Sequence, residues 1–149
     1  MTVSTGIPIN STGLLTPARE TMAVETRHVL IVDDEEDIRE IVQLALETMG
    51  GWEVFTAESG NEGLVQAEIQ QPDAILLDMM MPDMDGFTTL AYLQANPATS
   101  DIPVIFITAK GETVDRNRCV ELGAIAIIAK PFDPMTLTAQ IAHILGWDY

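Results

Sequence analysis

The fold is decided by the stretch at residues 74–86, which reads AILLDMMMPDMDG. Its first four residues form an apolar run as long as a buried strand, and this run stops at the carboxylate of Asp78. A turn with the sequence Pro-Asp-Met-Asp-Gly follows within a few positions. Because ligands bind at the carboxyl edge of an open parallel sheet, this position predicts that Asp78 is a functional acid at that edge.

Similar apolar runs lie on both sides of this stretch, and they alternate with longer segments of helical period. Expected strands cover residues 28–32, 53–57, 74–77, 103–107 and 124–129. Expected helices cover residues 35–49, 59–71, 87–96, 113–122 and a last segment that Asp133-Pro134 opens. Strict alternation is typical of parallel strands joined by right-handed crossovers. The sequence therefore predicts an α/β fold, with five helices on the two faces of a doubly wound five-stranded parallel sheet.

The apolar residues of four expected helices predict which side of each helix packs against the sheet. They are Ile38, Ile41, Val42, Ala45 and Met49, then Leu64, Ala67 and Ile69, then Phe87, Leu90, Ala91 and Leu93, and finally Leu137, Ile141, Ile144 and Leu145. Leu44 lies off the first of these stripes, so we expect its side chain to be exposed.

Length and charge limit the possible classes of function. A chain of 149 residues suits one domain with a proper core. With 7 Lys and Arg against 23 Asp and Glu, the formal charge is −16, which opposes phosphate backbones and anionic lipids. Direct nucleic-acid binding and membrane association are not expected. So many carboxylates instead favour divalent cations and basic protein surfaces as partners.

The chain is expected to be cytoplasmic. Cys119 is the single cysteine, so no internal disulfide can form, and neither a secretory signal nor a membrane-spanning run is evident. Residues 1–26 lack a period that would bury one face, which predicts a flexible leader before a domain at 27–149. Within this leader, Thr16-Pro17 could begin a short helix that runs through Val24.

Polar side chains follow four of the five expected strands. They are Asp33 and Asp34 after the first strand, Asp78 after the third, Thr108 after the fourth and Lys130 after the fifth. All strand ends of this kind meet at one edge of a parallel sheet, so these residues become neighbours. Three close carboxylates repel one another unless a hard cation such as Mg²⁺ lies between them. A carboxylate beside Mg²⁺, a hydroxyl and a lysine can attack a phosphoryl group.

Each of these residues also has a simpler interpretation when it is taken alone. Asp33 and Asp34 could cap the first helix, Thr108 could be an ordinary loop hydroxyl, and Lys130 could be a solvated charge. Their joint occurrence at four strand ends favours the phosphoryl site over these alternatives. His28 and His143 have no acids at ligand spacing and are expected to be structural or exposed.

Over residues 28–146 the sequence resembles the receiver domain of two-component response regulators. The matching features are Asp33-Asp34, Asp78 within LLDMxMPxMDG, Thr108-Ala109 and Lys130-Pro131-Phe132, in this order. Each motif is weak alone, and the set at these spacings is very specific. The resemblance implies a flavodoxin-like sheet with strand order 2-1-3-4-5, and a cis peptide bond between Lys130 and Pro131.

The resemblance also implies a chemistry and a set of partners. Asp78 would accept a phosphoryl group from a sensor histidine kinase or a histidine phosphotransfer protein. Asp34, Asp78 and the carbonyl of Met80 would bind Mg²⁺, with Asp33 acting mainly through water, and Thr108 and Lys130 would bind phosphoryl oxygens. The domain would then be a switch that phosphorylates and dephosphorylates itself, and not a metabolic enzyme.

One residue departs from the receiver pattern. Receivers often carry an aromatic residue three positions before the lysine of the fifth strand, and this chain has Ile127 there. The aromatic part of the switch is therefore expected to be missing. Any signal would then pass through shifts of the segment after Thr108 or through another side chain.

Three alternatives compete with this reading. An aspartyl-phosphate hydrolase of the haloacid-dehalogenase type needs a second acid two positions after the nucleophile, where Met80 stands. A receiver used only as an unphosphorylated interaction module would not need the full set of site residues. A flavodoxin-like cofactor site would need a phosphate-binding loop where residues 33–36 are all acidic.

The end of the chain at Tyr149 leaves no room for an output domain, so the sequence favours a stand-alone, chemotaxis-regulator-like receiver. Such a receiver would act on an unknown downstream protein, as a monomer or as a weak dimer that depends on phosphorylation.

Overall fold

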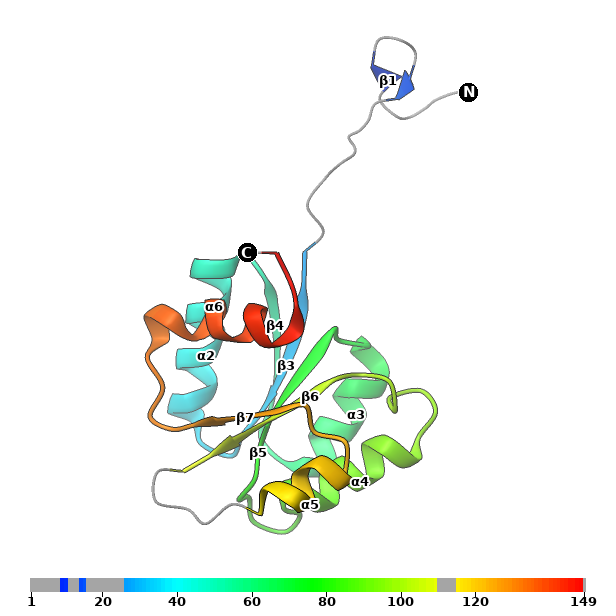
Figure 1. Cartoon of the computed structure of the whole chain (residues 1–149), viewed down its shortest axis with the longest axis vertical. Coiled ribbons are helices and arrows are strands. Elements are labelled where there is room, and N and C mark those ends of the chain that lie inside the picture. The colour runs from blue at the N-terminus through cyan, green and yellow to red at the C-terminus, as the bar shows by residue number, and fades with distance from the viewer. Residues whose placement is uncertain (1–8, 11–13, 16–25, 110–114, 149) are drawn as a thin grey trace.

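The computed structural model describes residues 9–10, 14–15, 26–109 and 115–148. Its centre is a parallel sheet in which five strands follow the order β4-β3-β5-β6-β7 (Figure 1). The strands are β3 (His28–Val32), β4 (Glu53–Ala57), β5 (Ala74–Asp78), β6 (Val104–Thr108) and β7 (Ala126–Ala129). Counted from the first strand of this sheet, the order is 2-1-3-4-5, which confirms the predicted topology.

Helices cover both faces of the sheet. They are α2 (Glu36–Gly50), α3 (Gly60–Gln70), α4 (Gly86–Ala95), α5 (Arg116–Glu121) and α6 (Pro134–Leu145). Helices α2 and α6 share one apolar core, and α3, α4 and α5 share the other. Among the described residues no helix is long and apolar enough to cross a membrane.

Both faces of each central strand are buried, which explains the nearly continuous apolar runs in the sequence. In β3, Val29 and Ile31 face the core under α2 and α6. The alternate residues Leu30 and Val32 face the core under α3 and α4. All four are at most 1% exposed. Such a strand can be apolar at every position because helices cover both of its faces and neither face contacts water.

The helix boundaries follow from side chains at the first turns and from glycine at the last. Ser59 is the N-cap of α3, because its hydroxyl accepts a hydrogen bond from the backbone N–H of Glu62 at 3.1 Å. Asp133 caps α6 in the same way, by accepting from Met135 at 2.9 Å. Gly51 ends α2 with a left-handed backbone, φ 66°, that glycine adopts without strain.

The predicted helix faces are correct in part. Val42, Ala45, Ala67, Leu90, Leu93, Leu137 and Ile141 are buried as expected, and Leu44 is exposed as expected. Ile41, Met49, Ile69 and Ala91 were predicted to pack inward and are exposed, whereas Leu46 is fully buried. The reason is geometric, because packing against the sheet rotates a helix so that its buried face does not coincide with the apolar stripe of its sequence. Residues at the margin of that stripe remain in water.

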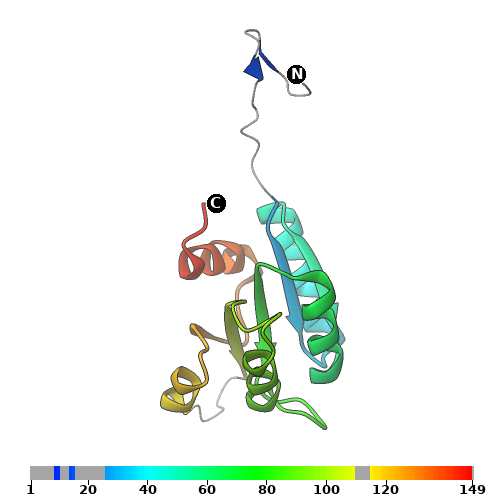
Figure 2. The same ribbon diagram turned by 90° about the vertical axis from the view of Figure 1, so that its right-hand side faces the viewer.

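The amino end of the sheet is closed by an aromatic cluster. Trp52 and Trp147 pack edge to face with ring centroids 5.1 Å apart, and the guanidinium of Arg27 lies 4.7 Å from the Trp147 ring. In both views of the molecule, the end of α6 lies at the same end as the start of β3 (Figures 1 and 2). The last residues of the domain are thereby packed against its first strand.

Before the domain, strands β1 (Ile9–Asn10) and β2 (Leu14–Leu15) form a short antiparallel pair. No strand was predicted for these residues. The helix predicted from Thr16-Pro17 through Val24 lies outside the described residues. The division into a leader at 1–26 and a domain at 27–149 stays a prediction.

Candidate functional site

Three carboxylates meet at the carboxyl end of the sheet. Asp33 and Asp34 follow β3 directly, and Asp78 is the last residue of the neighbouring strand β5. One oxygen from each of them lies within 4.8 Å of the others. Asp33 is 0% exposed and Asp78 is 4% exposed, while Asp34 faces solvent. The topology thus brings together acids that the sequence separates by more than forty positions.

Lys130, the residue after β7, places its ammonium group among these acids. Its Nζ atom lies 3.0 Å from Oδ2 of Asp33, 3.0 Å from Oε1 of Glu35 and 3.6 Å from Oδ2 of Asp78. The lysine side chain is only 12% exposed. Burial alone would lower the pKa of Lys130, but hydrogen bonds and charge from Glu35, Asp33 and Asp78 outweigh it and raise that pKa. The amine is therefore held as a cation.

One carboxylate oxygen of Asp33 accepts a backbone hydrogen bond and the other accepts no regular hydrogen bond. Oδ1 accepts a hydrogen bond from the backbone N–H of Glu35 at 2.9 Å. Oδ2 is buried and forms an ion pair with Nζ of Lys130 at 3.0 Å, but it accepts no regular hydrogen bond from the described residues. A buried carboxylate oxygen with this single partner, beside two further carboxylates, fits a hard divalent cation. The described residues therefore fit Mg²⁺.

Asp78 is held in a fixed orientation at the end of β5. Its Oδ1 accepts a hydrogen bond from the backbone N–H of Met80 at 3.2 Å, and Oδ2 faces Lys130. Burial and, next, the charge of Asp33 raise the pKa of Asp78 to about 7, against the opposing effects of Lys130 and of the hydrogen bond from Met80. Near neutral pH this carboxyl group can therefore change its protonation state.

Thr108 ends β6, between β5 and β7, and is 4% exposed. Its backbone carbonyl accepts the backbone N–H of Lys130 at 2.6 Å, so these two residues lie at the same edge. The Lys130–Pro131 peptide is cis, as predicted. Met80 follows Asp78 at the rim with a side chain that is 64% exposed. Whether its carbonyl binds a metal stays a prediction.

Two residues of this edge were missed in the sequence. Glu35 was read only as the start of a helix, and its carboxylate contacts Lys130, which lies 95 positions away. Gly86 was read only as part of a turn. A Cβ atom at Gly86 would lie 2.5 Å from the carbonyl oxygen of Asp78. The sole signal in the sequence for this close approach was the glycine itself, at the end of the turn after Asp78.

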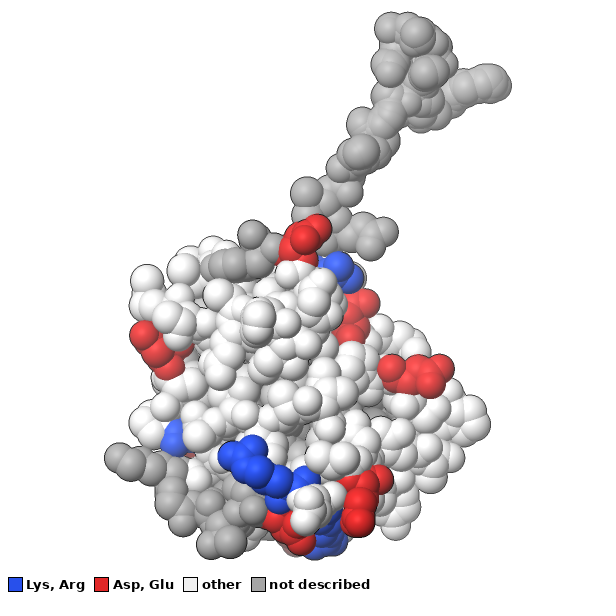
Figure 3. All heavy atoms as spheres, in the orientation of Figure 1, with Lys and Arg blue, Asp and Glu red and all other residues white. Residues whose placement is uncertain are grey.

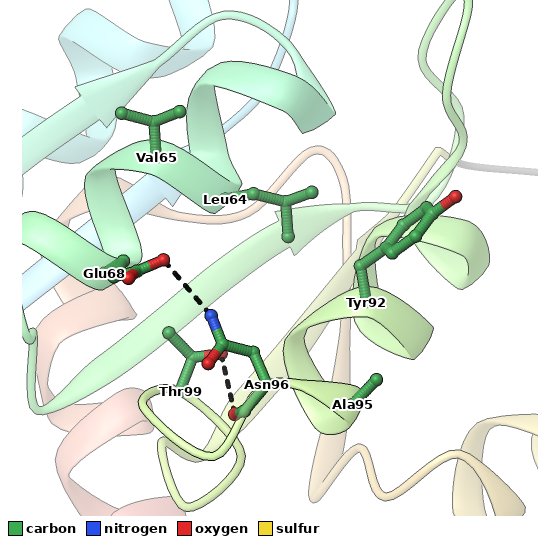
Figure 4. A pocket seen from close by; sticks show the side chains of 7 residues that line it. All are labelled: Leu64, Val65, Glu68, Tyr92, Ala95, Asn96 and Thr99. Atoms are coloured by element: carbon green, nitrogen blue, oxygen red, sulfur yellow. Dashed lines mark hydrogen bonds between the residues drawn. The ribbon is translucent and has the colours of Figure 1, made fainter.

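Hollows and charges away from the rim offer less chemistry. A groove of about 340 Å³ lies between α3 and α4 and is lined mainly by apolar side chains, with Asn96 donating a hydrogen bond to Glu68 at 3.2 Å (Figure 4). On the face shown in Figure 3, basic side chains gather over α5, which carries Arg116 and Arg118. The guanidinium carbon of Arg118 lies 4.1 Å from the centre of the Phe87 ring. This positive charge therefore makes a contact within the domain itself.

Known proteins match the chain over the whole sheet. The family model for the response regulator receiver domain matches residues 29–142. The chain is 40% identical to the probable transcriptional regulator ycf27 of Cyanophora paradoxa, over 83% of this chain and 50% of that protein. It is 41% identical to the phosphate regulon transcriptional regulatory protein PhoB of Pseudomonas aeruginosa, over 78% and 51%. The chain thus spans about half the length of these curated relatives.

Solved structures agree. A putative response regulator from Chloroflexus aurantiacus superposes with a TM-score of 0.74 at 34% identity, covering 82% of this chain and 99% of its own. The chemotaxis protein CheY4 of Vibrio cholerae superposes with a TM-score of 0.73 at 30% identity, covering 80% and 99%. These matches, together with the four motifs that meet at the carboxyl edge of the sheet, show that the chain belongs to the response regulator receiver domain family.

Proposed function

We propose that this chain is a phosphorylation switch whose acceptor is Asp78. The phosphoryl group would come from a phosphohistidine on a sensor histidine kinase or on a histidine phosphotransfer protein. One observation carries the proposal: the Asp78 carboxylate is buried at the sheet edge, within 4.8 Å of two further acids and 3.6 Å from a lysine ammonium. Membership of the receiver family already places the domain in two-component signalling.

The residues that would hold Mg²⁺ are Asp33, Asp34, Asp78 and the backbone carbonyl of Met80. All are hard oxygen donors, and the unsatisfied Oδ2 of Asp33 supports this choice. When bound, the ion supplies positive charge that neutralises the phosphoryl oxygens and the acceptor. Asp33, already held by the backbone N–H of Glu35, would act mainly through water.

In the transfer step an oxygen of Asp78 forms a bond to phosphorus, and the bond from phosphorus to the donor's imidazole nitrogen breaks. The electron pair of that bond returns to the imidazole. Lys130 balances the charge on the phosphoryl oxygens through its ammonium group, and the Thr108 hydroxyl donates a hydrogen bond to another oxygen. Only ionised Asp78 can attack, and the positive charges of Lys130 and of bound Mg²⁺ would favour that form.

The reverse reaction is hydrolysis of the acyl phosphate. Water attacks phosphorus and Asp78 leaves as a carboxylate, so the switch resets itself. This hydrolysis would limit how long the domain stays phosphorylated. We do not propose that the chain acts on a metabolite.

The phosphorylated domain would signal by contact with another protein. The formal charge of −16 favours a protein partner over nucleic acid for this chain. The curated relatives are about twice as long, and two of them are described as transcriptional regulators, so the partners of the whole protein are part of this proposal. We also propose that the receiver acts as a stand-alone protein, either as a monomer or as a weak dimer that depends on phosphorylation.

The output route is expected to differ from that of receivers with an aromatic residue before the lysine. Ile127 lies in β7 beside Phe106 of β6 and is partly buried on the face of α3, α4 and α5. A branched aliphatic side chain there has no ring to swing between two positions. We propose that the signal passes instead through shifts of the loop and helix after Thr108 or through another side chain.

Intact-mass measurement tests the acceptor directly. The protein is incubated with acetyl phosphate and Mg²⁺, beside the variant Asp78→Asn and the control Asp101→Asn, which removes an exposed carboxylate. We expect one added phosphoryl group in the wild type and the control, none in Asp78→Asn, and none with a chelator. A wild type that binds Mg²⁺ but gains no mass, even from a phosphorylated histidine donor, would favour the unphosphorylated interaction module.

A further inference from the structure

The ammonium group of Lys130 lies closer to Asp33 and Glu35 than to Asp78, the proposed phosphoryl acceptor. Its hydrogen bond goes to Oε1 of Glu35 at 3.0 Å, and its distance to Oδ2 of Asp33 is equally short. The distance to Oδ2 of Asp78, at 3.6 Å, is the longest of the three. Carboxylates lie on three sides of the ammonium group, so it has to give up one of these contacts to bind a phosphoryl oxygen.

The two acids that hold Lys130 differ in how easily they can leave. Asp33 is fully buried, and its other oxygen is bound to the backbone N–H of Glu35. The Glu35 side chain is 59% exposed, and its backbone is fixed at the start of α2 by accepting from the N–H of Arg39 at 3.2 Å. Its carboxylate can therefore swing into water while its Cα stays in place. Among these contacts, that of Glu35 costs least to break.

We propose that Glu35 is a positioning residue for phosphoryl transfer, a removable counter-ion that holds Lys130 off Asp78 until a phosphoryl group displaces it. This inference rests on the function proposed above. When phosphorus bonds to Asp78, its oxygens become acceptors for Lys130, and the lysine exchanges the Glu35 carboxylate for one of them. Breaking the Glu35 contact is then part of the cost of phosphorylation, so the residue sets how readily the switch is turned on.

The first arm of the test observes Lys130 without any phosphodonor. The ¹H–¹⁵N signal of the Lys130 ammonium is recorded by NMR in the wild type, in Glu35→Gln and in Glu36→Gln. Glu36 is an exposed neighbour with the same charge, and it is not among the acids that contact Lys130 in the described part of the chain. We expect the signal to shift or to be lost by exchange with water in Glu35→Gln only. A spectrum that stays the same in Glu35→Gln would overturn the proposal.

The second arm measures the initial rate of Asp78 phosphorylation against acetyl phosphate concentration at saturating Mg²⁺. Loss of a half-exposed ion pair predicts a rate about two- to fivefold higher in Glu35→Gln. Glu36→Gln removes the same charge and should change the rate by much less. Equal rates in the two variants would show that only the general charge of the rim matters, and would overturn the role of Glu35.

The two proposals fail in different ways. If the wild type gains no phosphoryl group from any donor, the proposed function fails, and the role of Glu35 fails with it. If the wild type is phosphorylated and Glu35→Gln behaves like Glu36→Gln, only the role of Glu35 fails. Urea unfolding of both variants, at equal midpoints, shows that a change in rate does not come from a damaged fold.

Discussion

The two ends of the sheet hold similar sets of charges in different surroundings. At the amino end, His28 lies between two acids, with Nε2 at 3.1 Å from Glu53 and Nδ1 at 3.5 Å from Asp73. At the carboxyl end, Lys130 lies between Asp33 and Asp78 at similar distances. The amino-end side chains are 39%, 56% and 41% exposed. Those of Lys130, Asp33 and Asp78 are 12%, 0% and 5% exposed.

Distance alone therefore does not tell a functional cluster from an ordinary one. Water screens the charges at the amino end, so those contacts contribute little to stability. At the carboxyl end the charges are taken out of water, which costs free energy unless each is paired. Two buried acids around one lysine, with one carboxylate oxygen that accepts no regular hydrogen bond, fit the binding of further positive charge.

The largest effect that would sharpen this contrast is expected from Lys130→Met. The variant leaves Asp33 and Asp78 without a buried counter-ion, and we expect it to lose roughly 3–5 kcal/mol of unfolding free energy at pH 8 without Mg²⁺. Urea denaturation followed by circular dichroism measures this loss. Added Mg²⁺ should restore part of it, because the ion replaces the missing positive charge. A loss under about 1 kcal/mol would mean that the carboxyl end is as well solvated as the amino end.

A smaller effect is expected from pH. The pKa of Asp78 is about 7 in the folded protein against 3.8 as the ordinary value, so the folded state binds the proton more tightly than the unfolded state. The unfolding free energy of the metal-free protein should therefore fall as pH rises from about 4 to 7 and level off above. Asp78→Asn should lack this part of the slope. Parallel pH profiles of wild type and Asp78→Asn would contradict the burial argument.

The smallest effect is expected at the amino end. His28→Gln removes both exposed contacts with Glu53 and Asp73, and it should change the unfolding free energy by less than about 0.5 kcal/mol at low salt. At 0.5 M salt the difference should shrink further, because screening weakens exposed charge pairs. Matched urea titrations at the two salt concentrations measure it. A change as large as that in Lys130→Met would remove the distinction between the two ends.

The fold could be predicted almost completely from local pattern. Strands β3 and β4 have the predicted bounds, and strict alternation with helices leaves few topologies open. Helix faces were predicted less well, since Ile69 and Ala91 are apolar yet exposed and Leu46 is buried outside the expected stripe. Periodicity shows which residues could face the core. The rotation of a helix on its sheet is decided by packing with neighbours that are distant in the sequence.

The residues of the site could be predicted because each follows a strand, and parallel topology then makes them neighbours. Their environment could not be predicted. The burial of Asp33 and the contact between Glu35 and Lys130 depend on how α2 and the turn after β7 approach each other across 95 positions. The close approach of the Gly86 backbone to the Asp78 carbonyl oxygen likewise depends on tertiary structure. The roles assigned to the site residues stay predictions until phosphorylation is measured.

The aromatic cluster at the amino end has a consequence for spectroscopy. Both tryptophans of the chain, Trp52 and Trp147, belong to it. The five residues of β3 separate the cluster from the acids, a span of about 16 Å. Intrinsic fluorescence should therefore report melting of the domain and stay silent when Asp78 binds a metal or a phosphoryl group. An optical assay of the switch needs a fluorophore introduced at the carboxyl end of the sheet.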